Sequence, residues 1–180
     1  MTRRTRRSLM PVCATLSMLV LAGLARADDI YMSATSKRGA YTGDSAKMTG
    51  KIDVTKFSYE VVSPRDPASG QATGKRQHRP VRIVKPVNAS SPQFFRAITT
   101  NELLNSVVID FVGTGPKGPQ LNYSVRLTNA FVTDFEQTTE TDAAGVAHVV
   151  EAVEFTFQAI EVFHGPSQTV VQDTWTTPTS

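Results

Sequence analysis

The sequence is poor in cysteine, in histidine and in tryptophan. Among 180 residues there is one cysteine, Cys13, with one tryptophan and three histidines. This excludes a disulfide framework and a cysteine-rich zinc module. With 40% hydrophobic and 19% charged residues, the chain is neither disordered along its whole length nor a polytopic membrane protein. The length fits one domain, and the net charge of +3 first suggests nucleic-acid binding.

The first 27 residues have the three parts of a secretory signal peptide. Four arginines within Arg3–Arg7 precede the apolar stretch Met10–Leu24, and Ala25-Arg26-Ala27 offers the small residues that signal peptidase accepts. We expect cleavage between Ala27 and Asp28, so that the chain is exported to the periplasm or secreted. A retained anchor is the alternative, but the 15 apolar residues are short for a membrane span and no stable insertion is expected. The arginines also loosely match a twin-arginine signal.

Removal of residues 1–27 reverses the sign of the net charge. That segment holds five of the 19 basic residues and no acidic one, so residues 28–180 carry 14 basic and 16 acidic side chains, a net charge of −2. Nucleic acid is therefore not an expected partner. Residues 28–180 also contain no cysteine, so their stability must come from packing and from assembly.

Alternating apolar and polar residues predict strands over most of the remaining chain. The longest alternations cover residues 121–135 and 149–159, and the first keeps the same face through Phe131 and Phe135. The polar segment 138–145 (TTETDAAG) predicts the turn of a long hairpin between them. Shorter strands are expected at 30–33, at 52–62 with a bulge near Thr55, at 81–85 and at 106–112.

One helix is expected, from Pro92 to about Thr100. Ser91 is a favourable N-cap, Pro92 suits the first helical position, and apolar residues recur on one side of the segment. The polar segments 37–51 and 63–79 are too long to be simple connectors in a compact domain. The pattern as a whole predicts a mainly β domain with one helix leaning on a sheet.

No catalytic, cofactor-binding or metal-binding constellation is found in the sequence. His78, His148 and His164 lie at no metal-ligand spacing, and the HExxH and GxSxG motifs are absent. We interpret each histidine as a surface or loop residue, and strand glutamates such as Glu151 as solvated charge. The segment 70–76 lacks both the spacing and the Ser/Thr of a phosphate loop. No enzymatic activity, cofactor or metal is therefore expected.

A basic run, Lys75–Arg79, stands out in this slightly acidic chain, with Arg82 and Lys85 following it. One interpretation is a protruding loop that contacts an acidic surface on another copy of the chain or on a partner. The other is a solvated run of charge without a specific role. The residues alone leave both open.

Six segments in a fixed order carry a family resemblance. They are ATGKRQHRPVRIVK (72–85), NASSPQFF (88–95), VVIDF (107–111), YSVRLTNA (123–130), EAVEFTF (151–157) and DTW (173–175). In this order they resemble the haemolysin-coregulated protein (Hcp) family, the tube proteins of type VI secretion. The resemblance extends over nearly the whole chain from about Ile30.

The resemblance implies a small β-barrel-like domain of two sheets with one flanking helix, occupying residues 28–180. It implies a non-enzymatic homo-oligomer, in which six copies form a ring and rings stack into a hollow tube that carries effectors in its lumen. Tip, sheath and effector proteins would be the partners. The residues that would form the loop between subunits and stacked rings are Gly74, Lys75, Arg76, Gln77, His78 and Arg79.

The N-terminus departs from the family pattern. Typical members begin at the equivalent of Ile30 and lack a signal peptide, because their tube assembles in the cytoplasm. A cleaved signal would send this chain to the periplasm instead. The alternative function is therefore an exported Hcp-like paralogue that acts as an extracytoplasmic binding or adhesive module.

Overall fold

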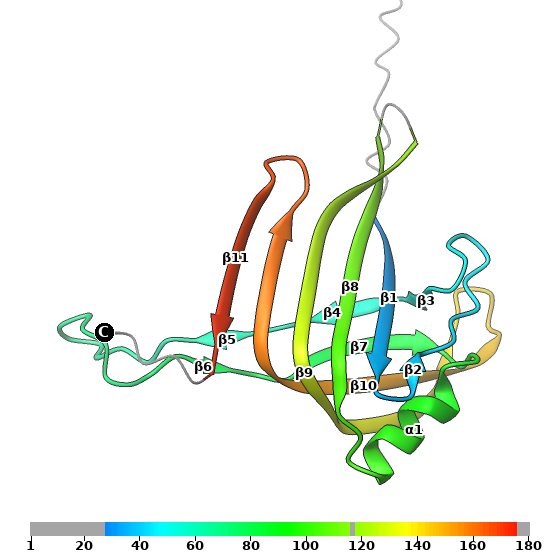
Figure 1. The fold of residues 1–180 in the computed structure, drawn as a ribbon, viewed down its shortest axis with the longest axis horizontal. Coiled ribbons are helices and arrows are strands. Elements are labelled where there is room, and N and C mark those ends of the chain that lie inside the picture. Colours follow the sequence, from blue (N-terminus) through cyan, green and yellow to red (C-terminus); the bar gives the residue numbers. More distant parts are fainter. Residues whose placement is uncertain (1–27, 116–117, 176–180) are drawn as a thin grey trace, which may run out of the picture.

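Figure 1 shows the computed structural model of the chain, which describes residues 28–115 and 118–175. The elements in chain order are β1 (Asp29–Ser36), β2 (Gly39–Ala40), β3 (Ile52–Val54), β4 (Lys56–Ser58), β5 (Val61–Val62), β6 (Gln77–His78), β7 (Val81–Pro86), α1 (Ser91–Thr99), β8 (Leu104–Gly115), β9 (Gly118–Thr141), β10 (Ala147–His164) and β11 (Thr169–Thr174). The prediction of a mainly β domain with one helix is confirmed. Within the described residues, no helix is long and apolar enough to cross a membrane.

Nine strands form one antiparallel sheet that closes on itself into a barrel. The strand order is β2-β1-β8-β9-β10-β7-β4, with β3 paired to β1 and β11 paired to β10. The segment 52–58 closes the barrel. Its first strand, β3, pairs with β1 near one end of the order, and its second, β4, pairs with β7 at the other end. At the junction, the backbone N–H and the hydroxyl of Thr55 both donate to the carbonyl of Val84, at 2.8 and 3.0 Å. The bulge expected near Thr55 is therefore a switch from one partner strand to another.

The strands β9 and β10 form the predicted long hairpin, and both bend so that they belong to both layers of the barrel (Figure 1). The first half of β9 pairs with β8, the first half of β10 with β7, and the end of β10 with β11. The turn is shorter than predicted, because residues 138–141 pair with 147–150 as strand. Three of these four residues are threonines, whose branched side chains favour strands.

The bend in β9 changes which side chains face the core. Leu127 is fully buried before the bend, and Val132 is 5% exposed after it. Between them, Asn129 adopts a left-handed φ of 50° and its side-chain amide donates to Gln158 Oε1 at 2.7 Å. The pairing with β10 keeps one register across this point, from Leu127↔Ile160 to Ala130↔Phe157, so the two strands turn together and the face of β9 that meets the core changes. The prediction that Phe131 faces the core is therefore wrong: its side chain is 39% exposed.

The helix α1 packs against the lower end of the barrel in Figure 1 and buries Phe94. The Phe94 ring lies 5.0 Å from that of Tyr41 and 5.9 Å from that of Phe155, measured between centroids. The helix begins one residue earlier than expected, with Ser90 rather than Ser91 at the N-cap position. Ser91 is instead the first helical residue, and its hydroxyl hydrogen-bonds to Lys85 and to Glu151 beneath the helix.

Candidate functional site

The predicted contact loop lies on an arm that projects from the barrel, at the left of Figure 1. We define the arm as residues 59–80. The strands β5 and β6 pair at its base, and a bridge joins Arg65 to Ala72 nearer its tip. At the tip, Asp66 accepts a hydrogen bond from the backbone N–H of Ser69 at 2.7 Å, which holds the pKa of Asp66 below its usual range. The arm is therefore a two-stranded ribbon held by hydrogen bonds within its own residues.

Side chains of the predicted loop alternate in direction, as the pleat of β6 requires. Arg76 and His78 turn toward β11, where both find partners. The loop residues that stay exposed are Gly74, Lys75, Gln77 and Arg79. The basic run is thus divided between a face that binds its own chain and a face that is open to a partner.

Asp173 of β11 binds the inward face of the arm. Arg76 donates to both carboxylate oxygens of Asp173 through Nε and Nη2, and to the carbonyl of Thr174 at 3.2 Å. His78 Nε2 lies 3.0 Å from Asp173 Oδ2, and His78 Nδ1 lies 2.5 Å from the hydroxyl of Tyr59. The Arg76 guanidinium holds the pKa of Asp173 below its usual range, so this carboxylate is charged at neutral pH.

Aromatic rings cover His78. The Tyr59 ring stacks on it at 6.2 Å between centroids, and the Trp175 ring lies at 5.6 Å. The His78 side chain is only 4% exposed, so its interpretation as a surface residue is wrong. His148 and His164 are exposed, as predicted. We call the group that joins the arm to the C-terminal strand the latch, and its members are Tyr59, Arg76, His78, Asp173 and Trp175.

A fully buried ion pair lies beneath α1. Lys85 Nζ on β7 is 2.5 Å from Glu151 Oε2 on β10, and both side chains are 0% exposed. Ser91 Oγ accepts from Lys85 at 3.0 Å and donates to Glu151 at 2.7 Å, while Gln137 Nε2 donates to the other carboxylate oxygen at 2.9 Å. Burial lowers the pKa of Lys85, and the nearby Glu151 opposes that change. The interpretation of Glu151 as solvated charge is wrong.

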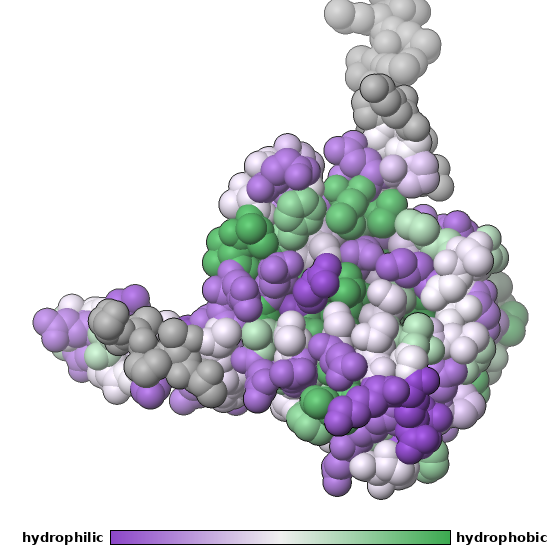
Figure 2. All heavy atoms as spheres, in the orientation of Figure 1, coloured by the Kyte–Doolittle hydropathy of each residue, from purple (hydrophilic) through white to green (hydrophobic). Residues whose placement is uncertain are grey.

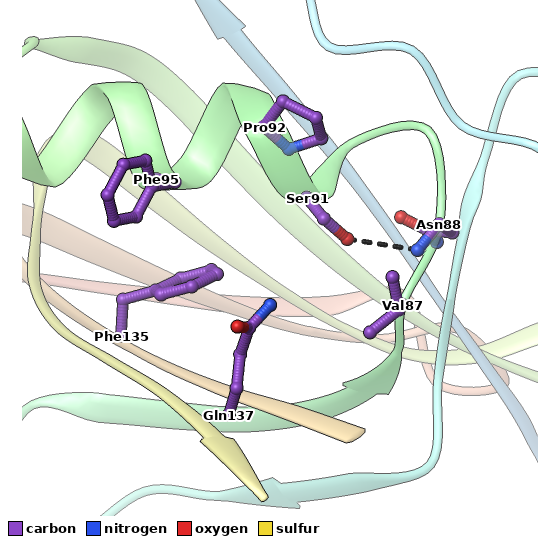
Figure 3. A pocket seen from close by; sticks show the side chains of 7 residues that line it. All are labelled: Val87, Asn88, Ser91, Pro92, Phe95, Phe135 and Gln137. Carbon is purple, nitrogen blue, oxygen red and sulfur yellow. Dashed lines mark hydrogen bonds between the residues drawn. The ribbon is translucent and has the colours of Figure 1, made fainter. Parts of the chain in front are cut away.

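A cleft of about 620 Å³ opens beside this ion pair, between α1 and β9. Figure 3 shows its lining, which consists of Val87, Asn88, Ser91, Pro92, Phe95, Phe135 and Gln137. Phe95 and Phe135 face each other across it with ring centroids 5.9 Å apart, and the Gln137 amide points into it. Apolar walls with a few amide groups suit a short peptide segment that carries an apolar side chain.

Sequence reasoning did not assign Tyr59, Asp173 or Trp175 to the contact loop. A signal was present in the segment 173–175, where an acidic and an aromatic residue share one face of a strand. No such signal marked Glu151, because its strand neighbours are compatible with either a wet or a buried face. Its burial depends on Lys85, which arrives from a different strand.

The remaining site predictions concern metals and the signal peptide. Within the described ranges, no group of three or more His, Cys, Asp or Glu residues is placed to hold a metal ion. Ala27 and the predicted signal peptide lie outside the described residues. Asp28, on the other side of the predicted cleavage point, accepts a hydrogen bond from Asn122 Nδ2 at 3.0 Å.

Comparisons with known proteins agree with this architecture. Residues 31–164 match the family described as "Type VI secretion system effector, Hcp". The major exported protein of Pseudomonas aeruginosa is 35% identical over 164 residues, which cover 82% of this chain and 95% of that protein. A crystal structure of an Hcp protein superposes with a TM-score of 0.75 at 22% identity, over 83% of this chain and 100% of that one. The secreted protein Hcp3 from Pseudomonas aeruginosa gives 0.68 at 26% identity, over 84% and 100%. The chain belongs to the Hcp family of type VI secretion system proteins.

Proposed function

We propose that this chain is a structural, non-enzymatic subunit of the type VI secretion tube. Six copies form a closed ring, rings stack into a hollow tube, and the lumen carries effectors. Its partners are other copies of the chain together with the tip, sheath and effector proteins of the system. The fold, the family and the arm all support this function, and one surface feature carries it.

That feature is the open edge of β11. Among the described residues β11 pairs only with β10, so the hydrogen-bonding groups on its other edge have no strand partner. On the same strand Val170 and Val171 are 55% and 66% exposed, and Figure 2 shows hydrophobic side chains over this part of the molecule. An exposed apolar edge promotes aggregation in a monomer. A closed ring covers such an edge with the next copy.

The test is the assembly state of residues 28–180, which contain the whole barrel and its core. We expect light scattering to give the mass of a ring, and electron microscopy to show particles with a central hole. Val171→Lys should weaken the ring because it places a charge on the open edge. Val146→Lys, at a position 51% exposed in the β9–β10 turn, is the matched control. A monodisperse monomer at high concentration would contradict the proposal. So would a result in which Val171→Lys and Val146→Lys weaken assembly equally.

We also infer that residues 1–27 are a signal peptide, removed between Ala27 and Asp28, and that the mature chain is exported to the periplasm or secreted. The support is the charged, apolar and small-residue pattern, together with relatives that are named as exported and as secreted. Mass spectrometry of the native protein should give an N-terminus at Asp28. Detection of Met1 in the released protein would contradict cleavage.

A second candidate function is an exported paralogue that serves as an extracytoplasmic binding or adhesive module. The cleft beside α1 favours it, because the cleft is large enough for a peptide segment and is not used by the latch. Blocking the general export pathway separates the two functions. Release that requires the general export pathway but no contractile system favours the exported module, whereas release that requires a contractile system favours the tube subunit.

A further inference from the structure

The two faces of the arm differ in whether their cationic side chains already have partners within the chain. On the inward face, Arg76 is bound to a carboxylate and a carbonyl, and His78 is 4% exposed, so neither can meet a partner without leaving the latch. On the outward face, Lys75 and Arg79 are exposed, and no hydrogen bond or ion pair of their side chains occurs within the described residues. Within the predicted loop, Lys75 and Arg79 are therefore the cations that are available for contact between molecules.

We propose that the latch is a positioning device for an interaction surface. Asp173 and Trp175 fix the direction of the arm so that Lys75 and Arg79 dock on the acidic body of a second copy. This inference rests on the proposed ring and tube function, and it deepens that function by naming the contact cations and the residues that aim them.

Charge complementarity identifies a second copy as the partner. The arm carries four basic residues, Arg65, Lys75, Arg76 and Arg79, against Glu60 and Asp66, a net charge of +2. The rest of residues 28–180 holds ten basic and fourteen acidic side chains, a net charge of −4. A basic arm on an acidic body attracts another molecule of the same kind and sets its orientation through the position of the arm. Such a contact weakens with added salt.

The latch is suited to aiming the arm because it acts at the base, where a small rotation moves the tip most. Asp173 binds two residues of the arm at once, Arg76 and His78, and a guanidinium paired with both carboxylate oxygens allows one orientation. The rest of the base is held by the two-residue pairing of β5 with β6, by the backbone N–H of Arg79, which donates to the carbonyl of Glu60 at 2.9 Å, and by the contact of Tyr59 with His78. Without Asp173, Arg76 and His78 lose their common acceptor and these contacts remain as the link.

The experiment compares two variants of residues 28–180 with wild type. Lys75→Glu with Arg79→Glu should raise the concentration needed for assembly about tenfold, with no change in acrylamide quenching of Trp175, the only tryptophan in the chain. Asp173→Asn should also impair assembly, and here the quenching of Trp175 should increase, because the latch is open. Quenching is measured at concentrations where all proteins are monomers, so it does not depend on assembly.

A control carries a reversal of charge on the body. Lys37→Glu changes an exposed lysine that makes no side-chain hydrogen bond or ion pair among the described residues; compared with Arg79→Glu alone, it should leave assembly unchanged. If this control impairs assembly as much as Arg79→Glu, the contact is not specific to the arm and the inference fails. It also fails if wild type forms rings and Asp173→Asn opens the latch without affecting them. If wild type remains a monomer, the proposed function itself fails, and this inference with it.

Discussion

Replacing Lys85 by methionine removes the cation of the buried ion pair and keeps a side chain of similar length and apolar character. In the native structure Lys85 Nζ serves several acceptors besides Glu151: the carbonyl of Pro86 at 3.1 Å, Asn88 Oδ1 at 3.0 Å and Ser91 Oγ at 3.0 Å. The variant removes the Lys85 donor from all of these, while Asn88 Oδ1 still accepts from Ser90 and Ser91 Oγ still accepts from the backbone N–H of Asn88. It also leaves the Glu151 carboxylate at 0% exposure without a cation.

The expected cost is large for a single substitution. Removing one partner of a buried ion pair costs about 3–5 kcal/mol, because the other charge stays in a medium that solvates it poorly. The free energy of unfolding of a domain is about 5–15 kcal/mol, so Lys85→Met should remove at least about a fifth of it. At this chain length the corresponding fall in Tm is about 10 °C.

The assay is urea unfolding followed by far-ultraviolet circular dichroism, at one protomer concentration below the onset of assembly. The matched variant is Lys85→Met with Glu151→Leu, which removes both charges. It should cost about 2 kcal/mol or less, since two apolar side chains of similar volume replace the pair. A free energy of unfolding for Lys85→Met within about 1 kcal/mol of wild type would refute the reasoning. So would a double variant whose loss of stability equals the sum of the losses from Lys85→Met and from Glu151→Leu alone.

Two further predictions concern the backbone and the latch. Gly165→Ala should lower the free energy of unfolding by about 1–3 kcal/mol, because the added Cβ would collide with a backbone carbonyl of β9; Gly74→Ala, whose Cβ would meet nothing closer than 3.8 Å, should cost under about 0.5 kcal/mol in the same urea assay. The folded-state pKa of Asp173 is lowered, so its contribution to stability is present above the unfolded pKa and is lost as pH falls through the folded pKa. Quenching of Trp175 should therefore increase only below the ordinary pKa of an aspartate, about 3.9, and an increase centred at or above that pH would contradict the assigned ion pair.

The sequence predicted the strands and the helix because their signals are local. Period-2 alternation located the long hairpin, and the Ser-Pro start located α1 to within one residue. The errors occur where the chain departs from regular pairing. Asn129 shifts the face of β9, and Thr55 moves the chain from one neighbouring strand to another. Both depend on which strand lies alongside, and a single sequence does not contain that information.

The candidate site was predicted in part, for the same reason. The run Lys75–Arg79 was visible as a concentration of charge, but its division into two faces required the partner strand β11. His78 and Glu151 were both assigned to the surface because charged and imidazole side chains are usually found there. Each is buried by a partner distant in sequence, Asp173 in one case and Lys85 in the other. Pairing between residues that are distant in the chain produces no periodic pattern in the sequence.

The buried ion pair contributes more to the position of α1 than to the net free energy of folding. Moving two charges out of water costs about as much as their attraction returns, so the pair adds little stability over apolar residues. Its geometry, however, joins β7, β10 and the first turn of the helix, because Ser91 Oγ must meet both Lys85 and Glu151. Residues 28–180 have no cysteine and therefore no covalent way to fix the helix.

The double variant Lys85→Met with Glu151→Leu tests this argument about the helix. It should keep most of the stability yet allow faster amide hydrogen exchange across residues 91–99, because local opening of α1 no longer breaks a polar network. Phe94 is 0% exposed and remains packed in the variant, so the rest of the barrel should exchange as in wild type. If exchange in α1 is unchanged, the packing of Phe94 alone holds the helix, and the ion pair has no positioning role.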